Sequence, residues 1–154
     1  MKQELAILIM SALPVTELRL SVPIAIGLFG FTPFKAWAIA FVGNLIPVPF
    51  LLAGMPKMLL WLEKRIPRFH RFVDKKLRAL EKDHMKSYQR FGALALAILV
   101  AAPLPGSGIW SVTALAVLFD IKHRYAVPAI IIGHVFASVG VVLLTIGAFK
   151  VTSL

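Results

Sequence analysis

The sequence has no cysteine and little charge, and each absence excludes a class of protein. Without cysteine the chain has neither a disulfide framework nor thiol chemistry, and its redox compartment stays open. Charged residues make up 16% of the chain and hydrophobic residues 59%, and the mean hydropathy is +0.85. A monomeric water-soluble globule could not bury that much apolar surface. The composition therefore predicts an integral membrane protein.

Motifs of catalysis and metal binding are also missing from the sequence. It contains no cluster of metal ligands, no nucleophile with its base and no phosphate-binding loop. We therefore expect no enzyme, no metal and no cofactor. Acids number seven against 17 lysines and arginines, which gives a net charge of +10. Eleven of these bases fall within 57–90, beside segments that need lipid, so we expect anionic headgroups rather than nucleic acid as the partner.

The chain contains an internal repeat, displaced by 91 positions at one landmark and by 90 at the other. The matched runs are Leu13-Pro14-Val15-Thr16 with Leu104-Pro105-Gly106-Ser107, and Gly43-Asn44 with Gly133-His134. Internal repeats in hydrophobic chains are typical of secondary transporters. Because the apolar run at 5–13 has a counterpart at 93–102, we expect it to be mature structure rather than a signal peptide.

Two segments are long enough to cross a membrane. A helix that rises about 1.5 Å per residue needs about 20 apolar residues to cross a hydrocarbon core of about 30 Å. Segments 34–55 and 124–150 meet this requirement. The runs 5–13 and 16–29 are each about half as deep as a membrane, and Pro14 between them disfavours a continuous helix.

The shorter runs have two interpretations. In the first, each pair forms a re-entrant hairpin, over 4–30 and over 91–120, with its tip near the bilayer midplane. In the second, each pair is one kinked helix and the chain crosses the membrane four times. The positive-inside rule puts the basic segment in the cytoplasm under both interpretations. Length favours hairpins, because 91–120 would be long for one helix and carries Pro103, Pro105 and Gly106 midway.

The hairpin interpretation predicts an all-α integral membrane protein with two inverted repeats. Residues 1–56 and 91–154 form the repeats, each a re-entrant helical hairpin followed by one transmembrane helix. Residues 57–90 join them as a basic amphipathic helix, with apolar residues at spacings of three and four. We expect this connector to lie in the cytoplasm against anionic headgroups, in a multi-pass protein of the cytoplasmic membrane.

The chemistry is expected at the hairpin tips, of which Pro14 marks the first. Glu17 and Arg19 lie in an apolar stretch, where a charge is costly unless it is paired or hydrated. If Thr16 caps the next half-helix, its free N–H groups face the same cavity as Arg19 and suit a phosphate or carboxylate. Glu17 either neutralises Arg19 or carries a coupling proton. The two residues are two apart, so they would not face each other on one regular helix.

The second tip carries no charge and is formed by Pro103, Pro105 and Gly106. Gly108 permits close approach of the backbone, Ser107 can cap the next half-helix, and Trp110 occupies the position of Arg19. The Trp110 indole either lines a substrate path or packs in the interior.

Two polar residues are matched between the long apolar segments. Asn44 and His134 each follow a glycine inside such a segment. An asparagine there commonly forms hydrogen bonds between helices. His134 is either a proton relay, because an imidazole titrates near neutrality, or a satisfied interior histidine.

Three runs carry a resemblance to a known family. They are Thr16-Glu17-Leu18-Arg19, Gly43-Asn44-Leu45-Ile46-Pro47-Val48 and Pro103-Leu104-Pro105-Gly106-Ser107-Gly108-Ile109-Trp110. They resemble the small multidrug export proteins of bacteria and archaea, over about residues 11–50 and 88–147. That family is distantly similar to the DedA and VTT-domain (SNARE-associated) membrane proteins. Those proteins have paired re-entrant hairpins and are implicated in proton-linked transport or scrambling of lipids, including polyprenyl phosphates.

The resemblance has consequences for single residues. It implies that Glu17 matches the hairpin acid of the DedA group. The arginines of that group's second hairpin have no match, because Trp110 and Ser111 occupy the corresponding stretch. The usual threonine of the second tip is Ser107, which keeps the hydroxyl.

These observations predict a proton-coupled secondary transporter of an amphipathic or lipid-linked anion, such as a polyprenyl phosphate or a phospholipid. The expected substrate site comprises Arg19, Thr16, Ser107, Gly108 and Trp110, and the expected proton carriers are Glu17 and His134. One alternative is an exporter of lipophilic cations, with Glu17 as the counter-charge. Another is a non-transporting membrane scaffold or assembly factor that recruits partners through the connector.

A homodimer is expected, because two full crossings and two hairpins make a thin wall around a cavity. Small residues on the last apolar segment could allow close contact between helices. They are Gly133, Ala137, Gly140 and Gly147.

Overall fold

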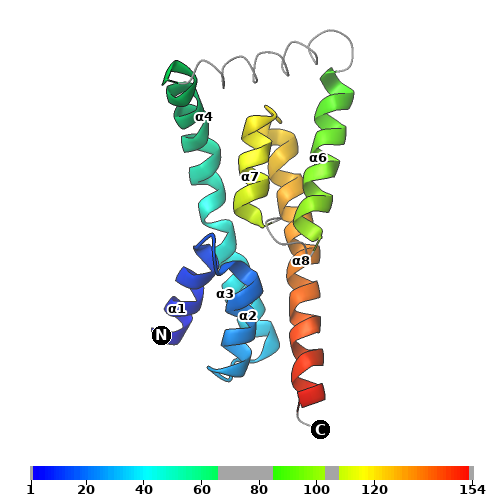
Figure 1. The fold of residues 1–154 in the computed structure, drawn as a ribbon. Helices are drawn as coiled ribbons and strands as arrows, with labels where there is room; N and C mark the ends of the chain where they lie inside the picture. Colours follow the sequence, from blue (N-terminus) through cyan, green and yellow to red (C-terminus); the bar gives the residue numbers. More distant parts are fainter. Residues whose placement is uncertain (1, 66–84, 103–107, 153–154) are drawn as a thin grey trace.

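In the computed structural model, residues 2–65, 85–102 and 108–152 are described, and every regular element in these ranges is a helix. Figure 1 shows the helices arranged along one long axis, with the start of α1 and the end of α8 at the same end of the molecule. The helices are α1 Lys2–Ala12, α2 Glu17–Gly27, α3 Pro33–Leu45, α4 Pro47–Arg65, α6 Met85–Ala101, α7 Ile109–Leu118 and α8 His123–Thr152.

Two helical stretches are long and apolar enough to cross a membrane. Helices α3 and α4 together provide one of 26 residues, Pro33–Met58, and α8 provides one of 29 residues, His123–Val151. At the rise of an α-helix these stretches measure about 39 and about 44 Å, which exceeds the roughly 30 Å of a hydrocarbon core. Only 33% of the apolar window of each stretch is buried within the molecule, so most of this apolar surface faces outward.

The outward surface of these stretches carries large apolar side chains. Phe34 is 75% exposed and Phe136 is 68% exposed. Soluble monomers rarely expose apolar patches of this extent, because water solvates them poorly. A lipid environment removes that cost, so the long helices support a membrane location.

Four helices form two antiparallel pairs, of which three helices are short and α6, with 17 residues, is about 26 Å long. Helices α1 and α2 have 11 residues each and α7 has 10, so each is about 15 to 17 Å long, or half a hydrocarbon core. Pro14 lies in the turn between α1 and α2, which run in opposite directions in Figure 1, as α6 and α7 do. Re-entry of these pairs into a bilayer, and their relation as inverted repeats, stay predictions.

Polar contacts hold the outer ends of the second pair together. The Gln89 side chain, 3% exposed, donates from Nε2 to the Asp120 carbonyl at 2.9 Å. The backbone N–H of Lys122 donates to Gln89 Oε1 at 2.7 Å, and the Tyr88 hydroxyl donates to the Phe119 carbonyl at 2.9 Å. The beginning of α6 therefore lies beside the segment that follows α7.

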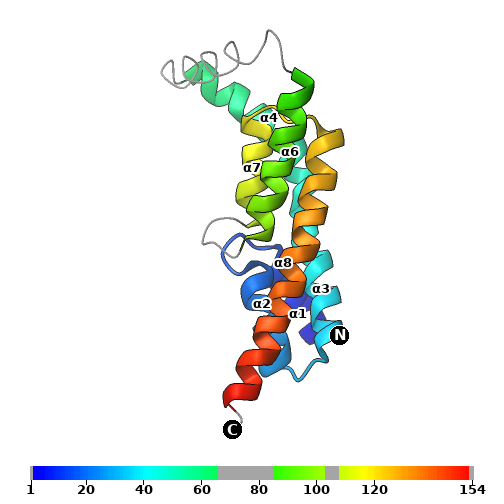
Figure 2. The same cartoon turned by 90° about the vertical axis from the view of Figure 1, so that its right-hand side faces the viewer.

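The inner ends of the two pairs meet at mid-height of the molecule. In both views the end of α1 and the beginning of α2 point toward the end of α6 and the beginning of α7 (Figures 1 and 2). The long helices α3 and α8 pass beside this meeting point and pack against each other. Each broken helix pair therefore presents its backbone ends to the other pair.

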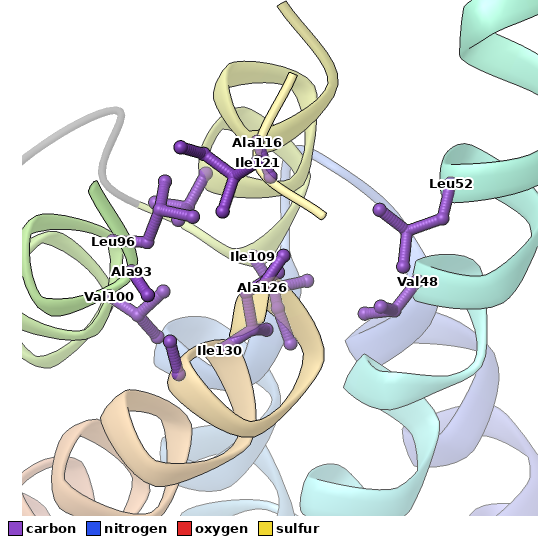
Figure 3. Close-up of a cluster of buried hydrophobic side chains, with 12 residues drawn as sticks. Val48, Leu52, Ala93, Leu96, Val100, Ile109, Ala116, Ile121, Ala126 and Ile130 are labelled. Atoms are coloured by element: carbon purple, nitrogen blue, oxygen red, sulfur yellow. The ribbon is translucent and has the colours of Figure 1, made fainter. Parts of the chain in front are cut away.

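Two clusters of buried apolar side chains lie on either side of this point. One joins α4, α6, α7 and α8, and Figure 3 shows Val48 and Leu52 of α4 facing residues of the other three helices, among them Ile109 and Ile130. The second cluster belongs to α1, α2 and α3 and consists of Ile7, Leu18, Val22, Ala25, Ala36 and Ala40.

Glycines allow each long helix to approach a short one closely. A side chain at Gly43 of α3 would overlap the Leu8 carbonyl oxygen and the Ser11 hydroxyl of α1. A side chain at Gly133 of α8 would overlap the Ala97 carbonyl oxygen of α6. The matched glycines of the sequence thus occupy comparable contacts between a long apolar stretch and the first helix of a pair.

The first long helix extends further than the segment 34–55. Helix α4 continues through Pro56 to Arg65, inside the region assigned to the connector, and α6 begins at Met85, before the predicted second repeat. A proline removes one backbone donor, but a helix can pass through it with a kink. The remainder of the connector, 66–84, lies outside the described residues.

Candidate functional site

Four polar residues, Glu17, Arg19, Asn44 and His134, line one cavity at the point where the two helix pairs meet. Its volume is about 20 Å³, which is room for a single water molecule. The lining residues come from α2, α3, α6, α7 and α8, with Gly108 just before α7, and they are Glu17, Leu18, Arg19, Asn44, Val100, Gly108, Ile109, His134, Ala137 and Val141. Residues that are about 90 positions apart in the sequence therefore face one another.

Glu17 opens α2, and its carboxylate reaches across to the second helix pair. The side chain is 9% exposed and lies directly on Gly108, where an added methyl group would overlap both carboxylate oxygens. The backbone N–H of Trp110 donates to the carboxylate. Glu17 has a φ of +41°, which is sterically costly for a residue with a side chain. Backbone strain thus accompanies the position of this acid.

Arg19 reaches the other broken helix of the second pair. Its Nη2 donates to the Ala102 carbonyl, just after α6, at 3.2 Å. The exposed C-terminal carbonyls of a helix carry partial negative charge and its N-terminal N–H groups carry partial positive charge. The acid Glu17 at the start of α7 and the base Arg19 at the end of α6 therefore each lie at the helix end of opposite sign.

Trp110 makes the corresponding contact in the reverse direction. Its Nε1 donates to the carbonyl of Ala12, the last residue of α1, at 3.0 Å. Arg19 and Trp110 are 91 positions apart, and their acceptors Ala12 and Ala102 are 90 apart. Each helix pair thus supplies a side-chain donor to the carbonyl at the C-terminal end of the first helix in the other pair.

Asn44 of α3 is buried, with 3% of its surface exposed, and lines the cavity. Its Oδ1 has no hydrogen-bond partner among the residues that the structure describes. An unpaired buried acceptor costs about 1 to 3 kcal/mol, and native structures contain few of them. Asn44 Oδ1 can therefore accept a hydrogen bond from a group that enters the cavity.

His134 of α8 is 2% exposed and belongs to the same cavity. Its ring stacks on Phe41, with centroids 4.6 Å apart and an interplanar angle of 18°. Nε2 lies 3.4 Å from the Phe41 carbonyl oxygen, so this nitrogen serves as a donor. The matched residues Asn44 and His134 thus line one cavity from two long helices.

Thr16 is the N-cap residue of α2, as expected, but its side chain does not cap the helix. The Thr16 backbone is helical, its side chain accepts no capping hydrogen bond, and its hydroxyl donates instead to the Met10 carbonyl. Helix α7 of the second pair has Gly108 as its N-cap residue, which has no side chain to cap the helix. Of the other predicted tip residues, Pro14 is exposed, whereas Pro103, Pro105, Gly106 and Ser107 lie outside the described residues.

Sequence reasoning missed several residues near the site. Ser21 lies one helical turn after Glu17, is fully buried, and its Oγ has no partner within the described ranges. A polar residue four positions after an acid in an apolar helix is a signal that could have indicated it. The carbonyls of Ala12 and Ala102 carry no such signal, because every residue has a backbone carbonyl.

Within the described parts of the chain, no group of His, Asp and Glu side chains could hold a metal ion.

Comparison with known proteins gives one match. Residues 17–139 match the family described as "Putative small multi-drug export protein". No curated protein and no solved structure matches the chain. The similarity to the DedA proteins stays a prediction. The matched range covers well over half of the chain and includes both Glu17 and His134, so the protein belongs to the small multi-drug export protein family of membrane proteins.

Proposed function

We propose that the protein is a proton-coupled secondary transporter that moves an amphipathic or lipid-linked anion, such as a phospholipid or a polyprenyl phosphate, across the cytoplasmic membrane. One observation carries the proposal: an acid, a base and the backbone ends of broken helices meet in a buried cavity between the long apolar helices. Charged groups at membrane depth are costly and are commonly retained for transport. Broken helices that face such a site are typical of secondary transporters.

The roles follow from the charges of the cavity. Arg19 and the N–H groups at the start of α7 attract the anion, and Glu17 carries the proton. His134, in the same cavity, relays this proton to Glu17. Trp110 lies beside the site and lines the path to it. A cavity of about 20 Å³ cannot hold a phosphate, so the two helix pairs must separate before the anion enters.

Topology and partners belong to the same proposal. The pairs α1–α2 and α6–α7 are re-entrant hairpins that enter from opposite faces of the membrane, so that separating either pair opens the cavity to one side. The basic segment 57–90 lies in the cytoplasm and gathers anionic lipid. Two copies of the chain form a dimer, in which glycines of α8 with open space around them, Gly140 and Gly147, allow close contact.

Reconstituted vesicles test the anion site. We expect wild-type protein to move fluorescent NBD-labelled phosphatidylglycerol between leaflets, measured by dithionite quenching of the outer leaflet. Arg19→Ala should remove this activity, because it removes the cationic group at the cavity. Arg19→Gln should also remove it, because glutamine keeps a polar side chain but lacks the positive charge. Arg124→Ala, at an exposed arginine outside the cavity, is the matched control. A normal rate in both Arg19 variants would contradict the proposal.

The family description favours a second candidate, export of lipophilic cationic drugs. In that case the buried Glu17 carboxylate is the counter-charge of the drug. Binding of tetraphenylphosphonium to purified protein distinguishes the two functions. Cation export predicts that Glu17→Gln abolishes this binding and that Arg19→Ala does not, whereas anion transport predicts no specific binding of this cation.

A further inference from the structure

The N-terminus of α7 is occupied by a carboxylate that belongs to the protein itself. Helix α7 has 10 residues, and its N-cap Gly108 makes no side-chain capping bond. The Glu17 carboxylate lies against Gly108 and accepts the Trp110 N–H, so it fills the place where a capping acceptor is normally found. A helix N-terminus of this kind is also the place where phosphate and carboxylate ligands bind. Glu17 therefore holds the position that an anionic ligand would take.

The cavity also contains a hydrogen-bond acceptor, Asn44 Oδ1, that suits the protonated form of Glu17. Asn44 Oδ1 is buried, lines the cavity and has no partner among the described residues. An ionised carboxylate only accepts hydrogen bonds, whereas a protonated carboxyl group has an O–H to donate. The N–H groups of α7 thus match ionised Glu17, and Asn44 Oδ1 matches protonated Glu17. The cavity contains partners for both forms.

Among the residues that the structure describes, two charged or titratable groups line the cavity beside Glu17. Arg19 comes from its own helix and His134 from α8, while the other lining residues, from α3, α6 and the start of α7, do not titrate. His134 Nε2 is directed at the Phe41 carbonyl. The formal charge of the cavity is therefore set by Glu17 and Arg19, and the ionised pair sums to zero. A bound monoanion restores this balance only if Glu17 takes up a proton.

We infer that the Glu17 carboxylate is a built-in substitute for the anionic group of the substrate, and that the two exclude each other from the N-terminus of α7. A group with a single negative charge binds there when Glu17 takes a proton from solution and turns toward Asn44. One proton is then bound for each monoanion, so the two move together as an electroneutral symport. This inference rests on the proposed function and specifies its ligand class and its coupling.

Binding of NBD-labelled phosphatidylglycerol to the purified protein tests this exclusion, because its phosphodiester keeps one negative charge across the pH range of the assay. Uptake of one proton per anion makes wild-type affinity fall about tenfold per pH unit once Glu17 ionises. Glu17→Gln should bind the lipid with the same affinity at every pH, and more tightly than wild type at high pH. Glu4→Gln, which changes an exposed acid paired with Lys35, should keep the wild-type pH dependence.

Each outcome is informative. If Glu17→Gln elutes as folded protein but loses the lipid, Glu17 is a partner of the anion and the exclusion is refuted. If wild type and Glu17→Gln share the same pH dependence, the exclusion is refuted while the anion site stands. If wild type does not bind the lipid at any pH, the proposed function itself fails. Asn44→Ala should shift the wild-type pH dependence to lower pH by about one unit, and an unchanged curve would contradict the role of its Oδ1.

A membrane potential tests the electroneutral coupling. In vesicles with a potassium gradient and valinomycin, wild-type transport of NBD-labelled phosphatidylglycerol should not depend on the potential, because proton and anion charges cancel. The Glu17→Gln protein carries the anion without the proton, so the potential should alter its rate. A wild-type rate that changes with the potential would overturn the symport.

Discussion

Replacing Gly108 with alanine tests the contact on which the site depends. The added methyl group would coincide with both oxygens of the Glu17 carboxylate, so the acid must leave the start of α7. The variant then loses a hydrogen bond to a charged group, which is worth about 1.5 to 3 kcal/mol. Crowding of a packed interior adds about 1 to 3 kcal/mol. Alanine recovers about 0.4 to 1 kcal/mol by restricting the unfolded chain, which leaves a net destabilisation of about 2 to 5 kcal/mol.

Thermal unfolding of the purified protein in detergent, followed by tryptophan fluorescence, measures this destabilisation. Gly54→Ala is the matched control, because a methyl group at that position of α4 has open space around it. The control should be neutral or slightly stabilising, since alanine favours a helix over glycine by about 1 kcal/mol. The Gly108 variant should unfold at a clearly lower temperature.

A double-mutant cycle makes the test specific to Glu17. In a Glu17→Ala background the three atoms nearest to the added methyl group are gone, so the alanine at position 108 should cost less. An equal cost of Gly108→Ala in both backgrounds would refute the contact between Glu17 and α7.

Three further predictions concern the packing around the site. Trp110→Phe removes the Nε1 donor and leaves the Ala12 carbonyl unpaired, so it should lower stability by about 1 to 3 kcal/mol in the same unfolding assay. Gln89→Leu removes the two hydrogen bonds that its side chain makes between α6 and the segment after α7, so proteolysis of that segment should become faster. Gly43→Ala should loosen α1 from α3, since the methyl group meets the Leu8 carbonyl, and should lower the unfolding temperature.

The sequence predicted the main divisions of the chain through lengths and prolines. A helix break at Pro14 and two long apolar stretches follow from backbone chemistry, which acts locally and can be read from neighbouring residues. The residues Asn44 and His134 were indicated by their matched positions, and the structure places both at one cavity. These features needed no knowledge of how distant segments pack.

Other features depended on tertiary packing and were not predictable. The sequence left open whether Glu17 neutralises Arg19 or carries a proton, and it could not show that they reach the ends of α7 and α6, which are 91 and 83 positions away. Thr16 has the residue type of a helix cap, yet its hydroxyl bonds back to the Met10 carbonyl, because local carbonyls compete for such side chains. The capping propensity of threonine does not tell whether its hydroxyl bonds to the N–H groups of α2 or to the Met10 carbonyl.

The central claim is that the chain turns back twice inside the membrane, and cysteine labelling tests it most directly. The protein has no cysteine of its own, so Ser87→Cys, His123→Cys and Thr152→Cys each introduce a single thiol at an end of α6 or α8. Two hairpins predict that a membrane-impermeant reagent on intact cells modifies position 152 and spares 87 and 123, which share the cytoplasmic side. Modification of 123 with protection of 87 and 152 would mean that α6 and α7 cross as one helix, and would contradict the claim.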